Sequence, residues 1–162
     1  MSDLLSIIQN DKRPAALSTS ALGIRGEDLA AKYVVANGYR LVLMNFKVPV
    51  GRNSKGVSVT GEIDLIALDG ETLCFIEVKT RRSEEFAAIL TAVDLQKQRQ
   101  ITRTAKVYRR IFAIRDMDWR YDVVTVLMPK HTDPTIKLTK AFWNENKFRK
   151  KTWNVQIWNE FL

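Results

Sequence analysis

Two carboxylates and an amine lie inside a stretch that is otherwise rich in apolar residues. The segment 60–82, TGEIDLIALDGETLCFIEVKTRR, contains two apolar runs separated by an Asp-Gly pair, and Asp64, Glu77 and Lys79 lie within these runs. Asp-Gly between two such runs is typical of a tight β-hairpin turn. The segment therefore predicts two antiparallel strands with charged residues at positions where a half-buried strand is usually apolar.

The length of the hairpin loop decides whether the two carboxylates meet. With an Asp69-Gly70 turn, Asp64 lies diagonal to Glu77, and with a four-residue loop it lies directly opposite, so both loops put the carboxylates on one face. A three-residue loop would send them to opposite faces. Strict alternation also sorts the other residues of the first strand. Glu62, Ile66 and Leu68 are expected beside Asp64, with Ile63, Leu65 and Ala67 on the other face.

This arrangement could hold a metal ion. Two neighbouring carboxylates remain ionised together only if a cation neutralises them. Their oxygens are hard ligands of the kind that Mg²⁺ or Mn²⁺ prefers. Lys79 can orient a water molecule or stabilise charge on a phosphate, which completes the components of phosphodiester hydrolysis. The alternative is that Asp64, Glu77 and Lys79 form a partly buried ion cluster or face solvent on a one-sided sheet.

A helix before the hairpin is expected to pack beside it. Its pattern begins near Ser20, with Ser18, Thr19 and Ser20 as candidate N-caps, and stops at Gly38. Spacing at 100° per residue places Glu27 at the edge of the inward face. That face consists of Leu22, Gly26, Leu29, Ala30, Tyr33 and Asn37. A first strand follows at 39–48, and 49–59 is predicted to be a flexible loop or a long hairpin tip.

A second long helix is predicted over residues 91–113, followed by strands at 119–128 and 136–143. Lys97 lies in the middle of its apolar face, where it needs a partner or must extend past the apolar layer to water. The apolar face consists of Val93, Ile101, Ala105, Tyr108, Ile111 and Phe112, and the opposite face of Arg99, Arg103, Lys106 and Arg110. Alternation in 152–157 predicts an added strand. The order of elements indicates a mixed α/β layer fold.

The composition limits the class of protein. A chain of 162 residues, of which 46% are hydrophobic and 27% charged, suits one globular domain. The net charge of +8 favours a polyanionic partner, first of all nucleic acid, although a solvated basic surface gives the same excess. The single cysteine, Cys74, permits no intramolecular disulfide, and no segment resembles a membrane span or a secretory signal. We expect a cytoplasmic protein, nucleoid-associated if it acts on DNA.

Three blocks of the sequence resemble a known family. GIRGEDLAAKYVVANGYRLVLMNFKV, GEIDLIALDGETLCFIEVKTRRS and AVDLQKQRQI closely resemble the UPF0102 (YraN-like) family of predicted endonucleases. That family is similar to archaeal Holliday-junction resolvases and belongs to the PD-(D/E)xK, restriction-endonuclease-like superfamily. The resemblance covers residues 21–142 and implies a mixed central sheet flanked by helices. It also implies a Mg²⁺-dependent (or Mn²⁺-dependent) endonuclease that hydrolyses DNA, with branched or single-stranded DNA as the expected substrate.

The resemblance assigns catalytic roles by position. Asp64 and Glu77 would bind Mg²⁺ together with the backbone carbonyl of Val78, and Lys79 would position the attacking water and stabilise the transition state. Glu27 matches an acidic residue on the first helix that helps to hold a metal or water, and an ordinary exposed glutamate is the alternative. Glu62 would either assist at the metal or be an ordinary residue at a strand end.

Substrate contacts are expected from two sources. Lys97 and Gln98 match a block that lies beside the active site in the family, so they are candidates for phosphate or carboxylate contacts. Basic loops would bind the DNA backbone without regard to sequence, through Arg52, Lys55, Arg81 and Arg82. Trp143, Trp153 and Trp158 would either stack on bases or belong to a core or interface.

Some features depart from the family and leave the partner open. The segment 49–59 is longer than usual, and residues 1–19 and the basic segment 144–162 flank the nuclease domain expected over 20–143. These additions are compatible with a homodimer or with incorporation in a larger complex. The main alternative is a non-catalytic nucleic-acid-binding or assembly protein on a nuclease fold. A third hypothesis is a metal-dependent enzyme that acts on another phosphate ester.

Overall fold

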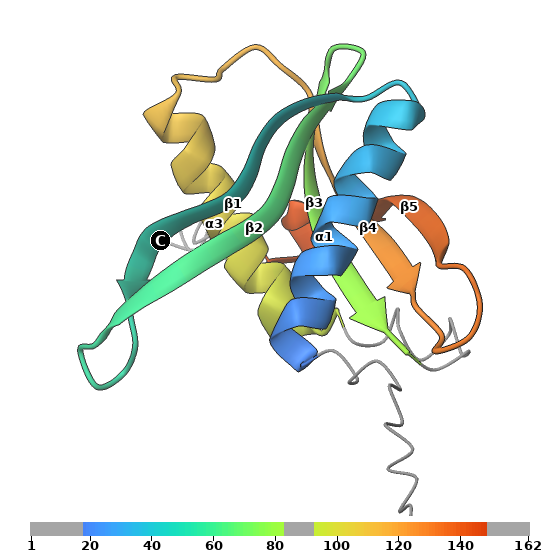
Figure 1. Ribbon diagram of the computed structural model, residues 1–162. Helices are drawn as coiled ribbons and strands as arrows, with labels where there is room; N and C mark the ends of the chain where they lie inside the picture. The colour runs from blue at the N-terminus through green and yellow to red at the C-terminus, as the bar shows by residue number, and fades with distance from the viewer. Residues whose placement is uncertain (1–17, 83–92, 149–162) are drawn as a thin grey trace, which may run out of the picture.

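The computed structural model describes residues 18–82 and 93–148, which form a five-stranded sheet with a helix on each face (Figure 1). In chain order the elements are α1 (Thr19–Ala36), β1 (Arg40–Arg52), β2 (Ser58–Asp69), β3 (Thr72–Arg81), α3 (Leu95–Ile111), β4 (Trp119–Leu127), β5 (Thr135–Trp143) and the 3₁₀ helix η1 (Glu145–Phe148). The strands lie side by side in sequence order. Only β3 and β4 pair in parallel in this sheet, so the predicted mixed α/β fold is confirmed.

The first helix begins and packs as its sequence predicts. The hydroxyl of Ser18 accepts a hydrogen bond from the N–H of Ala21, which satisfies a backbone donor that the helix leaves free. The inward residues of α1 pack on one face of the sheet, where Ala30 and Val34 are fully buried. The prediction is wrong for Asn37, which is exposed and donates its side-chain amide to the carbonyl of Tyr33.

A close approach at Gly26 fixes α1 against β3. A β carbon built on Gly26 would lie 1.8 Å from the hydroxyl oxygen of Thr80 and 2.9 Å from its β carbon. Only glycine allows the helix to approach the strand this closely. Because Glu27 is the next residue, the contact also sets how near that carboxylate lies to β3.

The replacement Gly26→Ala is therefore expected to destabilise the protein by about 1–3 kcal/mol, because α1 or Thr80 must move to admit the methyl group. The matched control is Gly23→Ala in the same helix, where an added β carbon meets nothing within 4 Å. That change should stabilise the helix by up to about 1 kcal/mol. Urea unfolding of both variants checks the pair, and equal effects of the two alanines would contradict the close approach.

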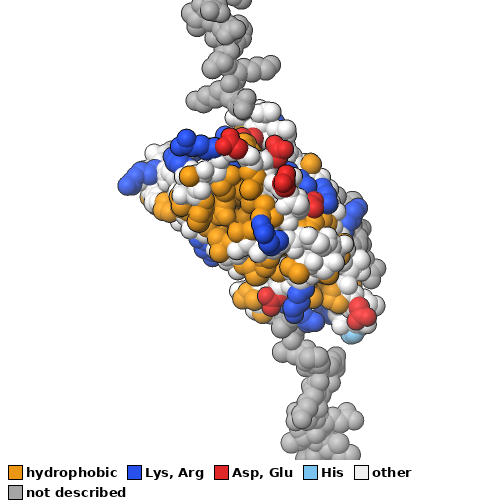
Figure 2. Space-filling view, turned by 90° about the horizontal axis from the view of Figure 1, so that it is seen from above, with side chains coloured by type: hydrophobic (Ala, Val, Ile, Leu, Met, Phe, Trp, Pro, Cys, Tyr) orange, Lys and Arg blue, Asp and Glu red, His pale blue; other side chains and the backbone are white. Residues whose placement is uncertain are grey.

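The second helix packs on the opposite face of the sheet. The side chain of Asp94 accepts from the N–H of Lys97 at 2.8 Å and caps α3. The buried residues of α3 are Gln98, Ile101, Thr102, Thr104, Ala105 and Tyr108. The predicted basic face of this helix is exposed. The prediction is wrong at the C-terminal end, where Ile111 and Phe112 are 57% and 54% exposed. The last turn of α3 rises toward the side shown in Figure 2, on which hydrophobic side chains gather at the surface.

The segment 49–59 forms the tip of a long hairpin, which confirms the second of the two predicted alternatives, and more than half of it is strand. β1 continues to Arg52 and β2 begins at Ser58, so the two strands form a long ribbon that extends past the sheet (Figure 1). Asn53 closes its tip, because its side-chain oxygen accepts from the N–H groups of Lys55 and Val57, each at 3.0 Å. The polar composition of this segment reflects the exposure of a projecting hairpin.

The turn between β2 and β3 uses different residues from those predicted. Asp69 pairs with Thr72, so the loop residues are Gly70 and Glu71, and Gly70 has a φ of 60°. The positive φ at the first loop position explains why glycine is placed there. This register is the one predicted for the longer loop, in which Asp64 lies directly opposite Glu77.

The β1–β2 ribbon has register shifts at Leu41/Leu43 and Pro49/Gly51, and strict alternation also fails between them. Ile63 and Leu65 are two residues apart, yet Ile63 packs under α3 and Leu65 packs under α1. Met44 and Phe46 on β1 are divided between the two faces in the same way. The expected placement of Ile63 with Leu65 is therefore wrong. Asn45 lies at this point with a φ of 53°, in the left-handed region.

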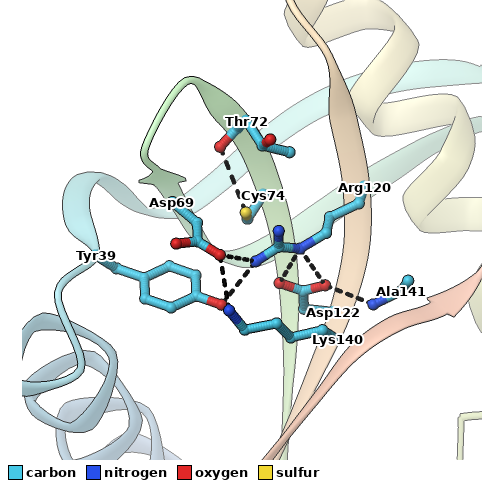
Figure 3. Close-up of polar contacts among 8 residues, drawn as sticks. All are labelled: Tyr39, Asp69, Thr72, Cys74, Arg120, Asp122, Lys140 and Ala141. Atoms are coloured by element: carbon cyan, nitrogen blue, oxygen red, sulfur yellow. Dashed lines mark hydrogen bonds and ion pairs between the residues drawn. The ribbon is translucent and has the colours of Figure 1, made fainter.

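A polar network joins three strands and the residue before β1 at the end of the sheet that carries the β2–β3 turn (Figure 3). The guanidinium of Arg120 donates to both oxygens of Asp122 at 3.0 Å, to Asp69 at 2.5 Å and to the hydroxyl of Tyr39 at 2.7 Å. Asp122 is fully buried and also accepts from the N–H of Ala141. Lys140 donates to Asp69 at 2.8 Å. The network ties β2, β4 and β5 to the start of β1.

Several predictions fall outside the described residues. They are the strand at 152–157, the N-terminal extension up to residue 17, and the environments of Trp153 and Trp158. Trp143 is buried, stacks on Tyr121 and donates its indole N–H to Thr102 at 3.1 Å, so it belongs to the core and is not a platform for bases. Within residues 18–82 and 93–148, no helix is both long and apolar enough to cross a membrane.

Candidate active site

The two carboxylates of the hairpin lie together in the middle of the sheet. The pairing of Leu65 with Ile76, continued by one residue, sets Asp64 opposite Glu77. Both side chains are buried, with 8% and 2% of their residue surfaces exposed. The Oδ2 atom of Asp64 accepts a hydrogen bond of 2.7 Å from the N–H of Val78, which fixes the carboxylate against β3.

Burial next to a second carboxylate makes Asp64 hard to ionise. The pKa of Asp64 is raised to about 7, first by burial and then by the charge of Glu77. The N–H of Val78 and the charge of Lys97 lower this pKa, but they do not offset the two larger effects. A carboxyl group whose pKa lies this far above its usual range is typical of a functional site.

Two lysines from different elements neutralise Glu77. The Nζ atom of Lys79 lies 2.7 Å from Oε1, and that of Lys97, which comes from α3, lies 3.3 Å from Oε2. Lys97 lies on the apolar face of α3 and was expected to need a partner there, and that partner is Glu77. Oε2 nevertheless accepts no hydrogen bond from any described residue. A buried carboxylate oxygen without a hydrogen bond is costly unless it serves a ligand.

Glu27 approaches this cluster from α1. It is partly buried, and its pKa is raised by burial, while a hydrogen bond to the side chain of Asn45 lowers it. The charges of Glu62 and Glu77 raise the same pKa, so the three acids share one electrostatic environment. Glu62 itself forms an ion pair of 3.1 Å with Lys47 on β1. Glu27 is therefore not fully exposed, and its role in holding a metal or water stays a prediction.

The predicted substrate contacts are more dispersed. Gln98 is buried, donates to the carbonyl of Val93 at 2.7 Å and accepts from Lys147, so both ends of its amide are used inside the protein. Gln98 therefore has a structural role, and its expected contact with substrate stays a prediction. The remaining basic residues lie at two separate places. Arg81 and Arg82 are at the end of β3, and Arg52 and Lys55 are at the tip of the β1–β2 ribbon.

The donor set suits a hard cation that keeps part of its water shell. Among residues 18–82 and 93–148, no group of three or more His, Cys, Asp or Glu side chains is placed to hold a metal ion. The buried pair Asp64 and Glu77 supplies two oxygen ligands, one of them the oxygen without a hydrogen bond. Mg²⁺ commonly takes one or two carboxylates and fills its remaining positions with other oxygens and water. The residues present therefore fit such an ion.

Two residues that shape this site were not predicted from the sequence to do so. Gly26 sets the distance of α1 from β3, and Asn45 contacts Glu27 from β1. Helical spacing predicts Gly26 on the inward face, but a helical glycine gives no signal of what lies against it. Asn45 interrupts an apolar strand, and asparagine tolerates a left-handed backbone better than most residues. That interruption was the available signal.

The fold and the acidic hairpin define an α/β protein with a restriction-endonuclease-like mixed sheet. A model of the uncharacterised protein family UPF0102 matches residues 26–126. The chain belongs to the UPF0102 family. A UPF0102 protein of Prosthecochloris aestuarii is 38% identical over 76% of this chain and 94% of its own length. One from Chlorobium chlorochromatii is 40% identical over 79% of this chain and 95% of its own.

A solved structure shows a weaker likeness. It is described as the crystal structure of SSO0001, and it matches 81% of this chain with 15% sequence identity and a TM-score of 0.36. This chain spans only 56% of that protein. A likeness at this level supports no argument about the site.

Proposed function

We propose that the protein is a metal-dependent endonuclease that hydrolyses phosphodiester bonds in DNA, with branched or single-stranded DNA as substrate. The observation that carries the proposal is the buried pair of Asp64 and Glu77 with two lysines on Glu77. A structural ion cluster would pair each carboxylate with a cation. Here two cations contact one carboxylate, and the other remains hard to ionise.

The side chains divide the work of such a reaction. Asp64, Glu77 and the carbonyl of Val78 would hold Mg²⁺ or Mn²⁺. When bound, the ion would supply positive charge for the phosphate and lower the pKa of a water molecule. Lys79, with 19% of its side chain exposed, is placed to orient that water and to stabilise charge on the phosphate. The ammonium of Lys97 can move from Oε2 of Glu77 to a substrate phosphate, because the carboxylate and the phosphate are both anions that attract it.

Basic side chains at the surface support a polyanionic substrate. Arg99, Arg103, Lys106 and Arg110 form an exposed stripe on α3, and Arg52 and Lys55 lie exposed at the tip of the ribbon. Such residues bind phosphates without reading sequence, and their affinity falls steeply with salt. Selection of a branched or single-stranded structure by shape fits this kind of contact better than selection of a base sequence.

The test is cleavage of branched, single-stranded and duplex DNA of matched length with Mg²⁺ or Mn²⁺. We expect Asp64→Ala to abolish cleavage, and Lys79→Ala to slow it by about 10²–10³-fold, the usual cost of losing one charge-stabilising group. The controls are Asp28→Ala and Lys32→Ala, which remove the same kinds of charge from the exposed side of α1. Equal binding and no cleavage by all proteins would contradict catalysis and favour a nucleic-acid-binding or assembly role.

A further inference from the structure

Asn45 adopts a backbone conformation that its place in a strand does not require. Its φ of 53° lies in the left-handed region, although the residue belongs to β1. Three non-glycine residues of the described chain have a positive φ, namely Asn45, Ala113 and Ala141. Such a conformation persists only when its surroundings enforce it, and it is common near functional sites.

The register places this residue beside Asp64. Met44 pairs with Leu65 and Phe46 pairs with Ile63, so Asn45 lies opposite Asp64 on the neighbouring strand. Asp64 therefore lies between Asn45 on β1 and Glu77 on β3. At this pair of residues both strands exchange the face that they present to α1 and to α3.

The exchange has a direct consequence for the acidic residues. Glu62, two residues before Asp64, forms an ion pair with Lys47, and its charge raises the pKa of Glu27. Asp64 instead accepts a hydrogen bond from the N–H of Val78. A regular strand would place residues 62 and 64 on the same face. The left-handed residue is the local irregularity at which the facing changes.

The side chain of Asn45 makes a second contribution. It interacts with the side chain of Glu27 and lowers the pKa of that carboxylate, and Glu27 reaches the acidic cluster from α1. Asn45 thus connects the helix carboxylate with the strand on which the site is built. A leucine or valine at the same position could provide neither the backbone conformation nor the interaction with Glu27.

We propose that Asn45 is a positioning residue: its left-handed backbone directs Asp64 toward Val78, and its amide holds Glu27 beside the acidic pair. The proposal deepens the proposed nuclease function and rests on it for the activity measurement only. The two contributions can be separated by two variants. Asn45→Gly keeps the left-handed backbone and removes the amide. Asn45→Ala disfavours the left-handed backbone and also removes the amide.

The first readout needs no catalysis. The Val78 N–H donates to Asp64, so its amide signal in a ¹H–¹⁵N spectrum and its rate of hydrogen exchange report the placement of that carboxylate. We expect Asn45→Gly to leave both unchanged, and Asn45→Ala to shift the signal and speed exchange at Val78 by tenfold or more. The control is Ala113→Gly, which relieves a left-handed alanine in the loop after α3 and should not affect Val78.

The second readout is cleavage of the best DNA substrate. Asn45→Gly should lose about tenfold in kcat, which corresponds to one hydrogen bond, and Asn45→Ala should lose more. An unchanged Val78 signal in a folded Asn45→Ala protein overturns the proposal. If that variant does not fold, a displaced Val78 signal in Asn45→Gly overturns it instead. A Val78 response without DNA cleavage by the wild type supports the positioning role and refutes the nuclease function.

Discussion

Without divalent metal, Asp64→Asn is expected to make the protein more stable than the wild type at pH 8. The buried carboxyl of Asp64 has its pKa raised from 3.8 to about 7, so the folded state holds a proton that the unfolded chain releases. Stability of the wild type must then fall as pH rises from about 4 to about 7, at roughly 1.4 kcal/mol for each pH unit. The total is several kcal/mol.

Asparagine should avoid this loss at little structural cost. Its side-chain oxygen can still accept from the N–H of Val78, and no charge is buried beside Glu77. The difference in unfolding free energy between variant and wild type should therefore be small at pH 4.5 and grow until about pH 7. Urea titrations at four pH values measure it, with Asp28→Asn on the exposed side of α1 as the control.

Mg²⁺ or Mn²⁺ should reverse the order of stability. An ion that binds only the folded state stabilises the wild type in proportion to its occupancy. Asp64→Asn lacks one of the two carboxylates and should respond much less. Parallel pH profiles of the two proteins in the absence of metal would show that Asp64 ionises freely in the folded state. In that case the proposed site loses its electrostatic basis.

The acidic hairpin was predictable because a strand repeats every two residues. Apolar runs separated by Asp-Gly predict a hairpin, and the loop length then determines whether Asp64 and Glu77 share a face. The structure selects Gly70 and Glu71 as the loop, since only Gly70 accepts the positive φ there. The partnership of Lys97 with Glu77 was predictable in part, because a lysine on an apolar helix face requires a partner.

The remaining features depend on distances that no local pattern encodes. Amphipathic spacing places Ile111 and Phe112 on the inward face of α3, but it does not say where the sheet beneath the helix ends. Alternation likewise assumes that every strand residue has a regular backbone. Both strands exchange faces at the left-handed residue Asn45 and its neighbour Asp64, and Ile63 packs in the core under α3.

Arg120→Met is expected to destabilise the protein by about 3–5 kcal/mol, although Arg120 lies outside the proposed site. Arg120 supplies the only cation in contact with Asp122 among the described residues, and Asp122 is fully buried. Removing one partner of a buried ion pair leaves the other charge uncompensated, which is the costly case. Asp69 would also lose one of its two cationic partners.

The same network provides its own controls. Lys140→Met removes the second partner of Asp69, but the lysine side chain is 53% exposed, so the expected loss is about 1 kcal/mol or less. In the double variant Arg120→Met with Asp122→Asn, the neutral amide can still accept from the N–H of Ala141, and much of the stability should return. Urea unfolding at pH 7 measures all three variants. A loss in Arg120→Met no greater than that in Lys140→Met would mean that the buried carboxylate of Asp122 needs no cation.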